Sequence, residues 1–249
     1  MSVLIVSGTG TGVGKTVVTA AVAALAAGRG ARVAVIKPAQ TGVDADEPGD
    51  ADVVSHLTGL NDIHEWSRYP FPLSPAASAR HSATAPPDVG SMAARIQALT
   101  HDHRLVLVEG AGGLLVRYDE DGTTIADLAK MLNAPVLVVC DPGLGTLNHT
   151  ALTLEVLAHR GIQCEGIVIG AWPVDPDLAC RSNIRDLETL AARPLSGALP
   201  AGAAHVRPAD FLTLSRAGLG PSLGGTFDAA DFRRTWAPTD GVARDHHGR

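Results

Sequence analysis

A glycine-rich segment that ends in lysine and threonine carries the clearest chemistry of this sequence. Residues 8–16 read GTGTGVGKT, between an apolar run at residues 3–6 and an alanine-rich stretch that starts at Lys15. Glycines of this kind let backbone N–H groups curl around a phosphate, while Lys15 reaches the β and γ phosphates and Thr16 offers a hydroxyl to Mg²⁺. The segment predicts a bound nucleoside triphosphate. The predicted nucleotide-binding residues are Gly12, Val13, Gly14, Lys15, Thr16 and Val17.

The spacing of these glycines departs from the usual phosphate loop. Five residues separate Gly8 from Gly14 and three separate Gly10 from it, whereas four is usual. A glycine-rich turn without lysine would also suit tight packing alone. The combination of strand, Gly-Lys-Thr and helix favours phosphate binding, so we interpret the segment as a variant of the loop.

Two charged side chains end apolar runs and are expected at the same edge of a sheet. Lys37 follows residues 33–36, and Glu109 follows residues 105–108 and precedes Gly-Ala-Gly-Gly. Ligands bind at the carboxyl ends of strands in open α/β sheets, which places both groups beside the phosphate loop. Glu109 suits a Mg²⁺ ligand, and the bare backbone after it permits close approach of a substrate.

Each of these residues also has an ordinary structural explanation. A lysine at a strand end often extends its ammonium into water, but Pro38 and Gly42 fix a backbone turn near Lys37 and favour a functional role. Asp50 and Asp52, predicted in the loop after the second strand, offer a further metal oxygen, although acidic loops are usually only solvated.

A parallel sheet flanked by helices is required to position these groups. Short runs rich in Val, Ile and Leu lie at residues 3–6, 33–36, 105–108, 136–140 and 167–169, and helix-like stretches lie at residues 15–27, 89–99, 124–132, 147–159 and 177–191. Buried strands that alternate with helices are typical of right-handed βαβ units. We therefore predict an α/β fold, a three-layer, doubly wound, mainly parallel sheet of the P-loop NTPase type.

The length and the distribution of polar residues predict one domain and two irregular segments. The 249 residues, 45% of them hydrophobic, suit a single domain over residues 1–237. Residues 44–50 and 67–87 lack clear periodicity and are predicted as loops over one edge of the site. Residues 238–249 have almost nothing apolar to bury and are predicted as a disordered tail.

Composition argues against several classes of protein. The net charge is -6 and the 20 Lys and Arg residues are scattered, so nucleic acid is not an expected partner. Apolar runs fall well short of the roughly 20 residues that a membrane span needs, and a cytoplasmic location is expected. Cys140, Cys164 and Cys180 are widely spaced and odd in number, which indicates buried thiols and neither a disulfide framework nor a zinc site.

Taken together, the motifs resemble those of the dethiobiotin synthetase family. The resemblance runs from the first strand to about Trp236 and rests on several motifs in the right order. These are residues 8–16, Lys37-Pro38 with Thr41-Gly42, Asp50-Ala51, residues 108–113 (VEGAGG) and residues 144–149 (LGTLNH). The combination is far more specific than any one motif.

The resemblance implies a homodimeric, Mg²⁺-dependent ligase of biotin biosynthesis. Such an enzyme converts 7,8-diaminononanoate, CO₂ or bicarbonate, and ATP into dethiobiotin, ADP and phosphate. One amine of the substrate takes up CO₂ as a carbamate, and a carbamate oxygen attacks the γ-phosphate. The second amine then closes the ureido ring on the resulting anhydride.

The same resemblance assigns a role to each motif. Lys37 would hold the carbamate, Lys15 would neutralise the γ-phosphate, and Thr11, with both lysines, completes the predicted catalytic set. The implied metal ligands are Thr16, Asp50 and Glu109. The implied substrate-binding residues are Thr11, Lys37, Thr41, Gly110, Ala111, Gly112, Leu144, Gly145 and Asn148.

The segment at residues 143–150 opens a predicted helix whose N–H groups can receive the carboxylate at the far end of the substrate. In the family this tail is bound across the dimer interface, which implies that Gly145 and Asn148 serve the neighbouring subunit's site. Asn148 is almost equally well explained as a simple helix-start residue.

The base-reading position differs from that of many relatives. They often place an asparagine after the fifth strand to read adenine, whereas residues 170–175 (GAWPVD) contain none. Because the loop at residues 8–16 grips phosphates common to all nucleotides, we expect relaxed choice among nucleoside triphosphates.

Three other classes of protein fit the sequence less well. Partition- and cell-division-type ATPases place a signature lysine where this chain has Gly10. Amidating synthetases of the cobyrinate type append a glutaminase domain for which 249 residues leave no space. A bare nucleotide-binding scaffold leaves Lys37 and Glu109 unexplained.

Overall fold

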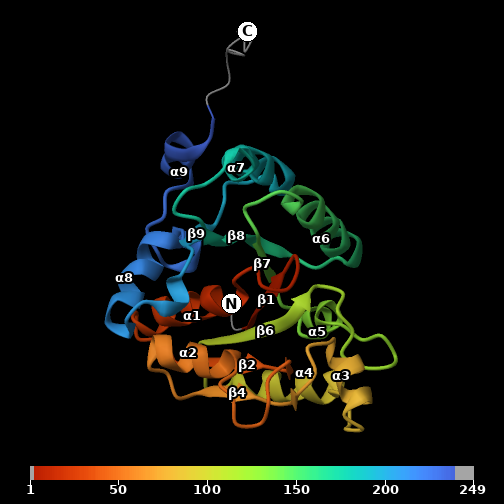
Figure 1. Ribbon diagram of the computed structural model, residues 1–249. Helices are drawn as coiled ribbons and strands as arrows, with labels where there is room; N and C mark the ends of the chain where they lie inside the picture. The colour runs from red at the N-terminus through yellow and green to blue at the C-terminus, as the bar shows by residue number, and fades with distance from the viewer. Residues whose placement is uncertain (1–2, 239–249) are drawn as a thin grey trace.

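A parallel sheet of seven strands forms the centre of the chain, whose residues 3–238 are described by a computed structural model (Figure 1). In sheet order the strands are β4 (Ile63–Glu65), β2 (Val33–Lys37), β6 (Leu105–Gly113), β1 (Val3–Gly8), β7 (Val136–Cys140), β8 (Cys164–Trp172) and β9 (Gly197–Pro200). Every neighbouring pair is parallel. The predicted α/β architecture is confirmed.

Side chains of the central strand alternate between two cores. On β1, Val3 and Ile5 belong to one buried cluster, while Leu4 and Val6 belong to the other. Successive side chains of a strand point to opposite faces, so a strand covered on both sides is apolar throughout. This is why the short apolar runs of the sequence form the inner strands.

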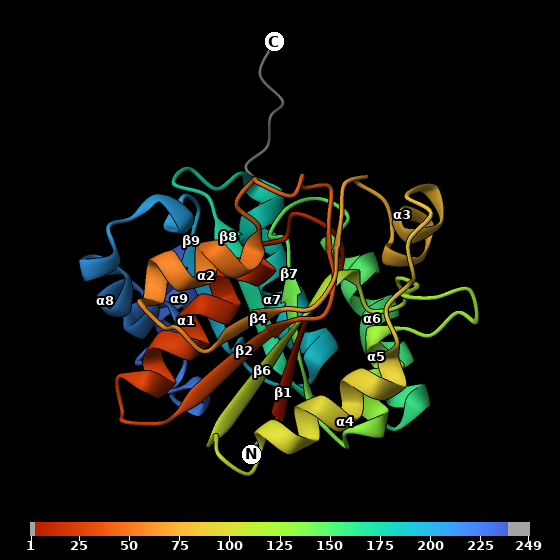
Figure 2. The ribbon, with the colours of Figure 1, turned by 90° about the horizontal axis from the view of Figure 1, so that it is seen from below.

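Helices cover both faces of the sheet and complete the three layers, as Figure 2 shows. One face is covered by α1 (Lys15–Ala27), α2 (Asp50–Thr58) and α8 (Pro208–Gly218). The other is covered by α4 (Val89–Leu99), α5 (Ile125–Met131), α6 (Thr146–Arg160) and α7 (Leu178–Ala191). Local signals set several boundaries: Asp127 accepts hydrogen bonds from Thr124 at the start of α5, and left-handed Gly161 ends α6.

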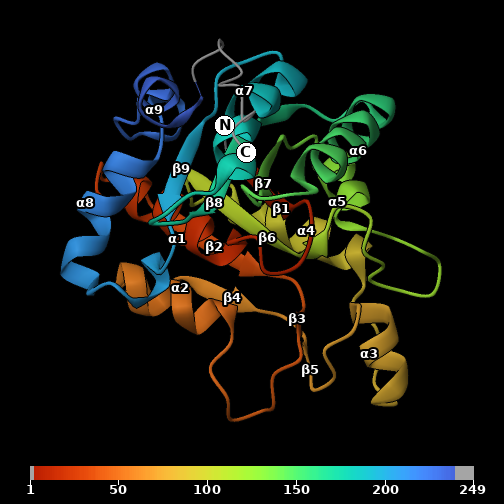
Figure 3. The same cartoon turned by 45° about the horizontal axis from the view of Figure 1, so that its top comes forward.

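One predicted loop, residues 67–87, contains regular structure, whereas the other, residues 44–50, is a loop up to Gly49. Residues 67–87 include strand β5 (Arg68–Tyr69), which pairs with β3 (Gln40–Thr41), and helix α3 (Pro75–His81), which lies beside them (Figure 3). Asp50 does not end a loop but begins α2. These elements are short and partly exposed, so they show too little hydrophobic periodicity for recognition.

Further elements lie where no prediction was made. The predicted strand at residues 105–108 continues to Gly113, so the glycines after Glu109 belong to β6. Strands β4 and β9 are edge strands, and α8, α9 (Ala229–Trp236) and the 3-10 turns Ala203–His205 and Pro221–Leu223 follow the last predicted helix. Strands of three or four residues are too short to show a clear hydrophobic pattern.

Three remaining expectations concern the tail, the membrane and the thiols. The predicted disordered tail, residues 238–249, lies outside the described residues except for Pro238. Among the helices of residues 3–238, none has the length and apolarity that a membrane crossing requires. Cys140 and Cys180 are buried as expected and Cys164 is half-buried, all three as free thiols.

Candidate active site

A cavity of about 620 Å³ opens at the carboxyl ends of β1, β2 and β6. Most of the residues predicted from the sequence line it, and they come from four segments: residues 11–17, 37–41, 50 and 109–112. The lining residues are Thr11, Gly12, Gly14, Lys15, Thr16, Val17, Lys37, Ala39, Gln40, Thr41, Asp50, Pro72, Leu73, Ser74, Pro75, Glu109, Ala111, Gly112 and Val116.

The phosphate loop joins β1 to α1 with two glycines in the left-handed region. Gly12 has φ 76° and Gly14, the residue before the helix, has φ 94°. A Cβ at Gly14 would lie 2.6 Å from the carbonyl oxygen of Gly170, so only glycine fits there. The first N–H groups of a helix have no partner within the helix, and the first residues of α1, Lys15, Thr16 and Val17, line the cavity.

Lys15 begins α1 and its ammonium folds back over the loop. Its Nζ donates a hydrogen bond to the carbonyl oxygen of Gly10 at 2.9 Å. Burial lowers the pKa of Lys15, and the nearby ammonium of Lys37 lowers it further. An anion in the cavity would favour the charged form of both lysines.

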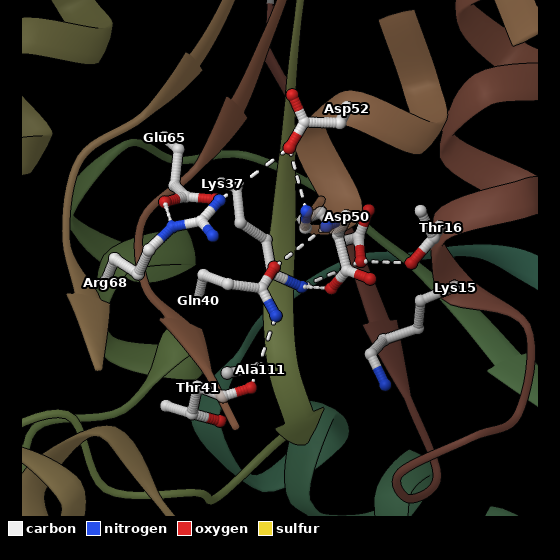
Figure 4. Close-up of polar contacts among 12 residues, drawn as sticks. Lys15, Thr16, Lys37, Gln40, Thr41, Asp50, Asp52, Glu65, Arg68 and Ala111 are labelled. Carbon is white, nitrogen blue, oxygen red and sulfur yellow. Dashed lines mark hydrogen bonds and ion pairs between the residues drawn. The ribbon is translucent and has the colours of Figure 1, made fainter. Parts of the chain in front are cut away.

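Lys37 lies between two carboxylates beneath the same loop (Figure 4). Its Nζ donates to Glu109 Oε1 at 2.8 Å and forms an ion pair with Asp50. Thr16 Oγ1 donates to the same Glu109 oxygen at 2.9 Å. The side chains of Lys37 and Glu109 are 5% and 2% exposed and therefore almost fully buried, whereas that of Asp50 is 33% exposed.

Electrostatics keep Lys37 and Asp50 ionised. Burial alone would lower the pKa of Lys37, but Glu109 and Asp50 outweigh burial and raise it. Burial would raise the pKa of Asp50, but Lys37 outweighs burial and lowers it. A buried charge is tolerated when it is paired and hydrogen-bonded, as all three groups are here.

The two aspartates that sequence reasoning left open have different surroundings. Both lie in the first turn of α2 and not in a loop. Asp50 points into the cavity toward Lys37, whereas Asp52 accepts a hydrogen bond from the backbone N–H of Gly49 at 2.8 Å. Asp50 therefore joins the cluster, and Asp52 caps the helix.

Thr16, Asp50 and Glu109 form a ligand set suited to Mg²⁺. Their donors are a hydroxyl and two carboxylates, all hard oxygen ligands, converging on one side of the cavity. Asp50 and Glu109 both contact Lys37, so an internal cation already sits at this pair of carboxylates. Across residues 3–238, no group of three or more His, Cys, Asp and Glu side chains could hold a metal, so a metal here would depend on the hydroxyl, phosphate and water as well.

Three of the predicted site residues, Ala111, Val13 and Gly110, have positions or contacts that limit how they could bind a ligand. Ala111 lines the cavity, but its N–H is taken by the hydroxyl of buried Tyr118 at 3.0 Å. Val13 is packed in the core beneath the loop. Gly110 is absent from the cavity wall, and a Cβ there would lie 3.3 Å from Ile125. These residues shape the backbone around the site.

The predicted tail-binding segment lies outside the cavity of one chain. Leu144 is 95% exposed, and Gly145 and Asn148 are also exposed at the start of α6. None of the three lines the cavity that holds Lys15 and Lys37.

Sequence reasoning missed several residues of the site. Gln40 and Ser74 line the cavity, and Arg68 from β5 holds the segment before Asp50. Gln40 lies between Lys37 and Thr41 in the sequence, and this position is the one feature that could have identified it as a site residue. Nothing in the sequence pattern singles out Arg68 or Ser74, since their placement depends on the small β3–β5 sheet.

Comparison with solved structures shows the same fold in distant nucleotide-binding proteins. The Pyrococcus furiosus cell division ATPase MinD matches with a TM-score of 0.54 and 18% identity, over 94% of this chain and 100% of that one. A ParA family ATPase from Chlorobium tepidum matches with a TM-score of 0.55 and 14% identity, over 94% and 98%. At these identities the likeness concerns the fold alone.

Comparison of sequences reaches much nearer relatives. The family model of an AAA domain, AAA_26, matches residues 2–209. The ATP-dependent dethiobiotin synthetase BioD of Parafrankia sp. (strain EAN1pec) is 64% identical over 95% of this chain and 100% of its own length. The protein of the same name from Frankia casuarinae is 61% identical over 94% and 98%, and that of Streptomyces coelicolor 52% over 93% and 98%. The chain therefore belongs to the ATP-dependent dethiobiotin synthetase family.

Proposed function

We propose that this chain forms the ureido ring of dethiobiotin in the cavity between the phosphate loop and Lys37. The observation that supports this most directly is that Thr16 and Lys37, from α1 and β2, donate to the same oxygen of Glu109. A nucleotide held by the loop would thus present its γ-phosphate beside the Lys37 ammonium. A carbamate needs a cation at that position to bind next to a phosphate.

The proposed reaction proceeds in three steps. A substrate amine adds to CO₂ and loses a proton, giving a carbamate whose charge Lys37 neutralises. A carbamate oxygen then attacks the γ-phosphorus of ATP, and ADP leaves. The second amine attacks the carbonyl carbon of this mixed anhydride, and phosphate leaves as the ring closes.

Residues of the chain act mainly by holding charges in fixed positions. Lys15 would shift from the Gly10 carbonyl to the γ-phosphate, and Thr11 and Thr41, both on the cavity wall, would hydrogen-bond the carbamate and phosphate oxygens. When Mg²⁺ is bound by Thr16, Asp50 and Glu109, it supplies neutralisation of the phosphate charge. Loss of one such preorganised charge costs about 3–4 kcal/mol, or roughly a hundredfold to a thousandfold in rate.

Replacement of Lys37 tests the assignment. In Lys37→Ala, dethiobiotin formation is expected to fall by roughly a hundredfold or more, because the carbamate loses its counter-charge. Nucleotide binding should remain, since the loop at residues 8–16 is intact. Dethiobiotin is quantified by mass spectrometry and nucleotide binding by calorimetry. Lys130→Ala, at an exposed position of α5, is the matched control. Wild-type turnover in Lys37→Ala would refute the assignment of Lys37 as the group that binds the carbamate.

A switch ATPase is the second candidate, because the fold is shared with MinD and ParA proteins. Such an ATPase would release phosphate at the same rate with or without the diamine. The synthetase releases phosphate in proportion to dethiobiotin, and only with diaminononanoate and bicarbonate present. A phosphate assay with these additions separates the two.

Nucleobase choice is expected to be relaxed. Trp172, in the segment where relatives read adenine, remains in β8 and packs edge-on against Phe232 and Trp236. It therefore contributes to the core beneath the base position. We expect turnover with CTP and GTP within about tenfold of that with ATP, a difference of roughly 1.4 kcal/mol in the activation barrier. Turnover with ATP alone would refute this expectation.

A homodimer is the proposed assembly, with a cytoplasmic location where ATP is produced. A shallow apolar hollow of about 300 Å³ is lined in part by Leu115, Leu152 and Val156, and it shares Val116 with the active-site cavity. Leu115 and Leu152 are 47% and 55% exposed. A second subunit on this face would cover them and could bring its own Gly145 and Asn148 to the far end of the substrate.

A further inference from the structure

The position of Asp50 depends on a segment that has little packing of its own. Residues 44–48, just before α2, are all exposed. The segment nevertheless delivers the carboxylate that contacts Lys37. Something outside the segment must fix where α2 begins.

Arg68 of β5 contacts this segment and the start of α2, and Figure 4 shows its contacts with Glu65 and Asp52. Its Nη1 donates to the backbone carbonyls of Asp44 at 2.9 Å and Glu47 at 2.5 Å. Its Nη2 lies 3.7 Å from Asp52, the residue that caps α2. One guanidinium thus joins both ends of the segment to the start of the helix.

Glu65 anchors this guanidinium to the central sheet. It accepts from Arg68 Nε at 2.6 Å and from Nη2 at 2.9 Å. In the sheet, Glu65 of β4 is the direct partner of Lys37 of β2. The anchor therefore stands beside the strand position that carries Lys37, and it fixes the distance between that strand and the segment.

Gln40 holds the helix start from the other side. Its Oε1 accepts the backbone N–H of Asp50 at 2.9 Å, and its Nε2 donates to the Thr41 carbonyl at 3.2 Å. Space at this corner is small, since a Cβ on Gly49 would lie 2.9 Å from atoms of both Arg68 and Glu65. The backbone of Asp50 is thus fixed between β3 and the Arg68–Glu65 pair.

We propose that Arg68 is a positioning residue that sets the Asp50 carboxylate for the metal of the bound nucleotide. This inference rests on the proposed function, in which Asp50 is a ligand of Mg²⁺. Arginine is needed because the guanidinium offers five donors in a rigid plane, and here it donates to two carbonyls and the Glu65 carboxylate while it forms an ion pair with Asp52. A lysine offers one compact charge and could serve only part of this set.

Removing Arg68 should lower the affinity for Mg²⁺ more than the affinity for the diamine substrate. Residues that orient a metal ligand typically contribute ten- to a hundredfold to metal affinity or activity. In Arg68→Ala we expect the Mg²⁺ concentration for half-maximal turnover to rise about tenfold or more. The KM for the diamine should stay within about twofold, and excess Mg²⁺ should restore kcat, because the catalytic lysines remain in place.

Hydrogen exchange provides a readout that needs no turnover. In the nucleotide-free protein, amides of residues 44–52 should exchange about tenfold faster in Arg68→Ala than in wild type, while the rest of the chain is unchanged. Arg68→Lys should fall between the two. Glu65→Gln, which keeps its size, should shift both readouts in the same direction and provides a second variant if Arg68→Ala fails to fold.

Arg234→Ala is the matched control, because Arg234 also pairs with an aspartate, Asp231, but on exposed α9. It should leave both readouts unchanged. Wild-type exchange and a wild-type Mg²⁺ requirement in Arg68→Ala would overturn the proposal, as would a loss of kcat that excess Mg²⁺ does not relieve. If the wild-type chain makes no dethiobiotin, the proposed function fails, and exchange together with Mg²⁺-dependent binding of a non-hydrolysable ATP analogue still decides the role of Arg68.

Discussion

At the scale of single residues, the site is a balance of buried charges. Lys37 pairs with two carboxylates, those of Glu109, which is 2% exposed, and Asp50, which is 33% exposed. Breaking a buried pair by removing one partner typically costs about 3–5 kcal/mol, because an uncompensated charge remains. The cluster therefore contributes to folding as well as to the proposed chemistry. The contributions of Asp50 and Lys37 to stability are lost at opposite ends of the pH range.

The stability of the cluster should be greatest between about pH 4 and pH 10. Asp50 has a lowered pKa in the fold, so its contribution is present above the unfolded value of about 3.9 and is lost as pH falls through the folded value. Lys37 has a raised pKa, so its contribution is present below about 10.4 and is lost as pH rises through the folded value. Urea unfolding without Mg²⁺ at several pH values measures this.

The variant Asp50→Asn isolates the acidic limb. Its deficit in unfolding free energy relative to wild type should be constant near neutral pH and should shrink below about pH 4, because the unfolded wild-type chain takes up a proton at Asp50 there while the folded chain does so only at lower pH. A deficit that stays the same down to about pH 2 would mean that the pair with Lys37 does not stabilise the fold.

At the scale of elements, the conformation of the loop between β1 and α1 depends on Gly14 far more than on Gly10. Gly14 combines a left-handed backbone with close approach to Gly170 of β8. Gly10, four residues earlier, would carry a Cβ with no other atom within 4 Å, and its φ is not left-handed. The two glycines therefore provide a matched pair of substitutions.

We expect Gly14→Ala to abolish measurable ATP binding and to lower the free energy of unfolding by at least about 1–3 kcal/mol, the usual cost of a strained backbone. Gly10→Ala should remain close to wild type in both. Calorimetric titration with Mg·ATP and thermal unfolding provide the measurements. Equal behaviour of the two variants would show that the left-handed turn at Gly14 is not required.

At the scale of the whole molecule, the surface around α6, with exposed Leu115 and Leu152, is the proposed dimer interface. It carries exposed leucines beside the cavity, and the predicted tail-binding residues Gly145 and Asn148 lie outside the cavity of their own chain. An apolar patch with such neighbours is typical of a protein interface. Completion of the substrate site would then require two chains.

Leu152→Glu should convert the proposed dimer into a monomer, because a carboxylate would be buried without a partner at the interface. The KM for diaminononanoate should rise at least about tenfold, while ATP binding by the loop is retained. Light scattering after gel filtration measures the mass, and Leu178→Glu, at an exposed leucine of α7, is the control. A dimer that persists in Leu152→Glu places the interface elsewhere.

Local patterns in the sequence were enough to predict much of the scaffold. Helices α1 and α4 and strand β7 were predicted at their observed bounds, because the apolar composition that marks a buried strand or helix is carried by consecutive residues. The glycine loop at residues 8–16 and Lys37 were predicted to lie at one sheet edge, and residues of both line the same cavity. Elements β3, β5, α2 and α3 were missed, because they are short and form through contacts with distant segments.

By itself, the sequence determined the fold class, the nucleotide loop and the family, all of which depend on order and spacing along the chain. Only the tertiary structure decided that Asp50 and not Asp52 meets Lys37, that Tyr118 occupies the N–H of Ala111, and that Arg68 holds the segment before α2. The physical reason is that hydrogen bonds and ion pairs act over about 3 Å in space. Their partners in this site stand as much as 93 residues apart in the chain, as Thr16 and Glu109 do.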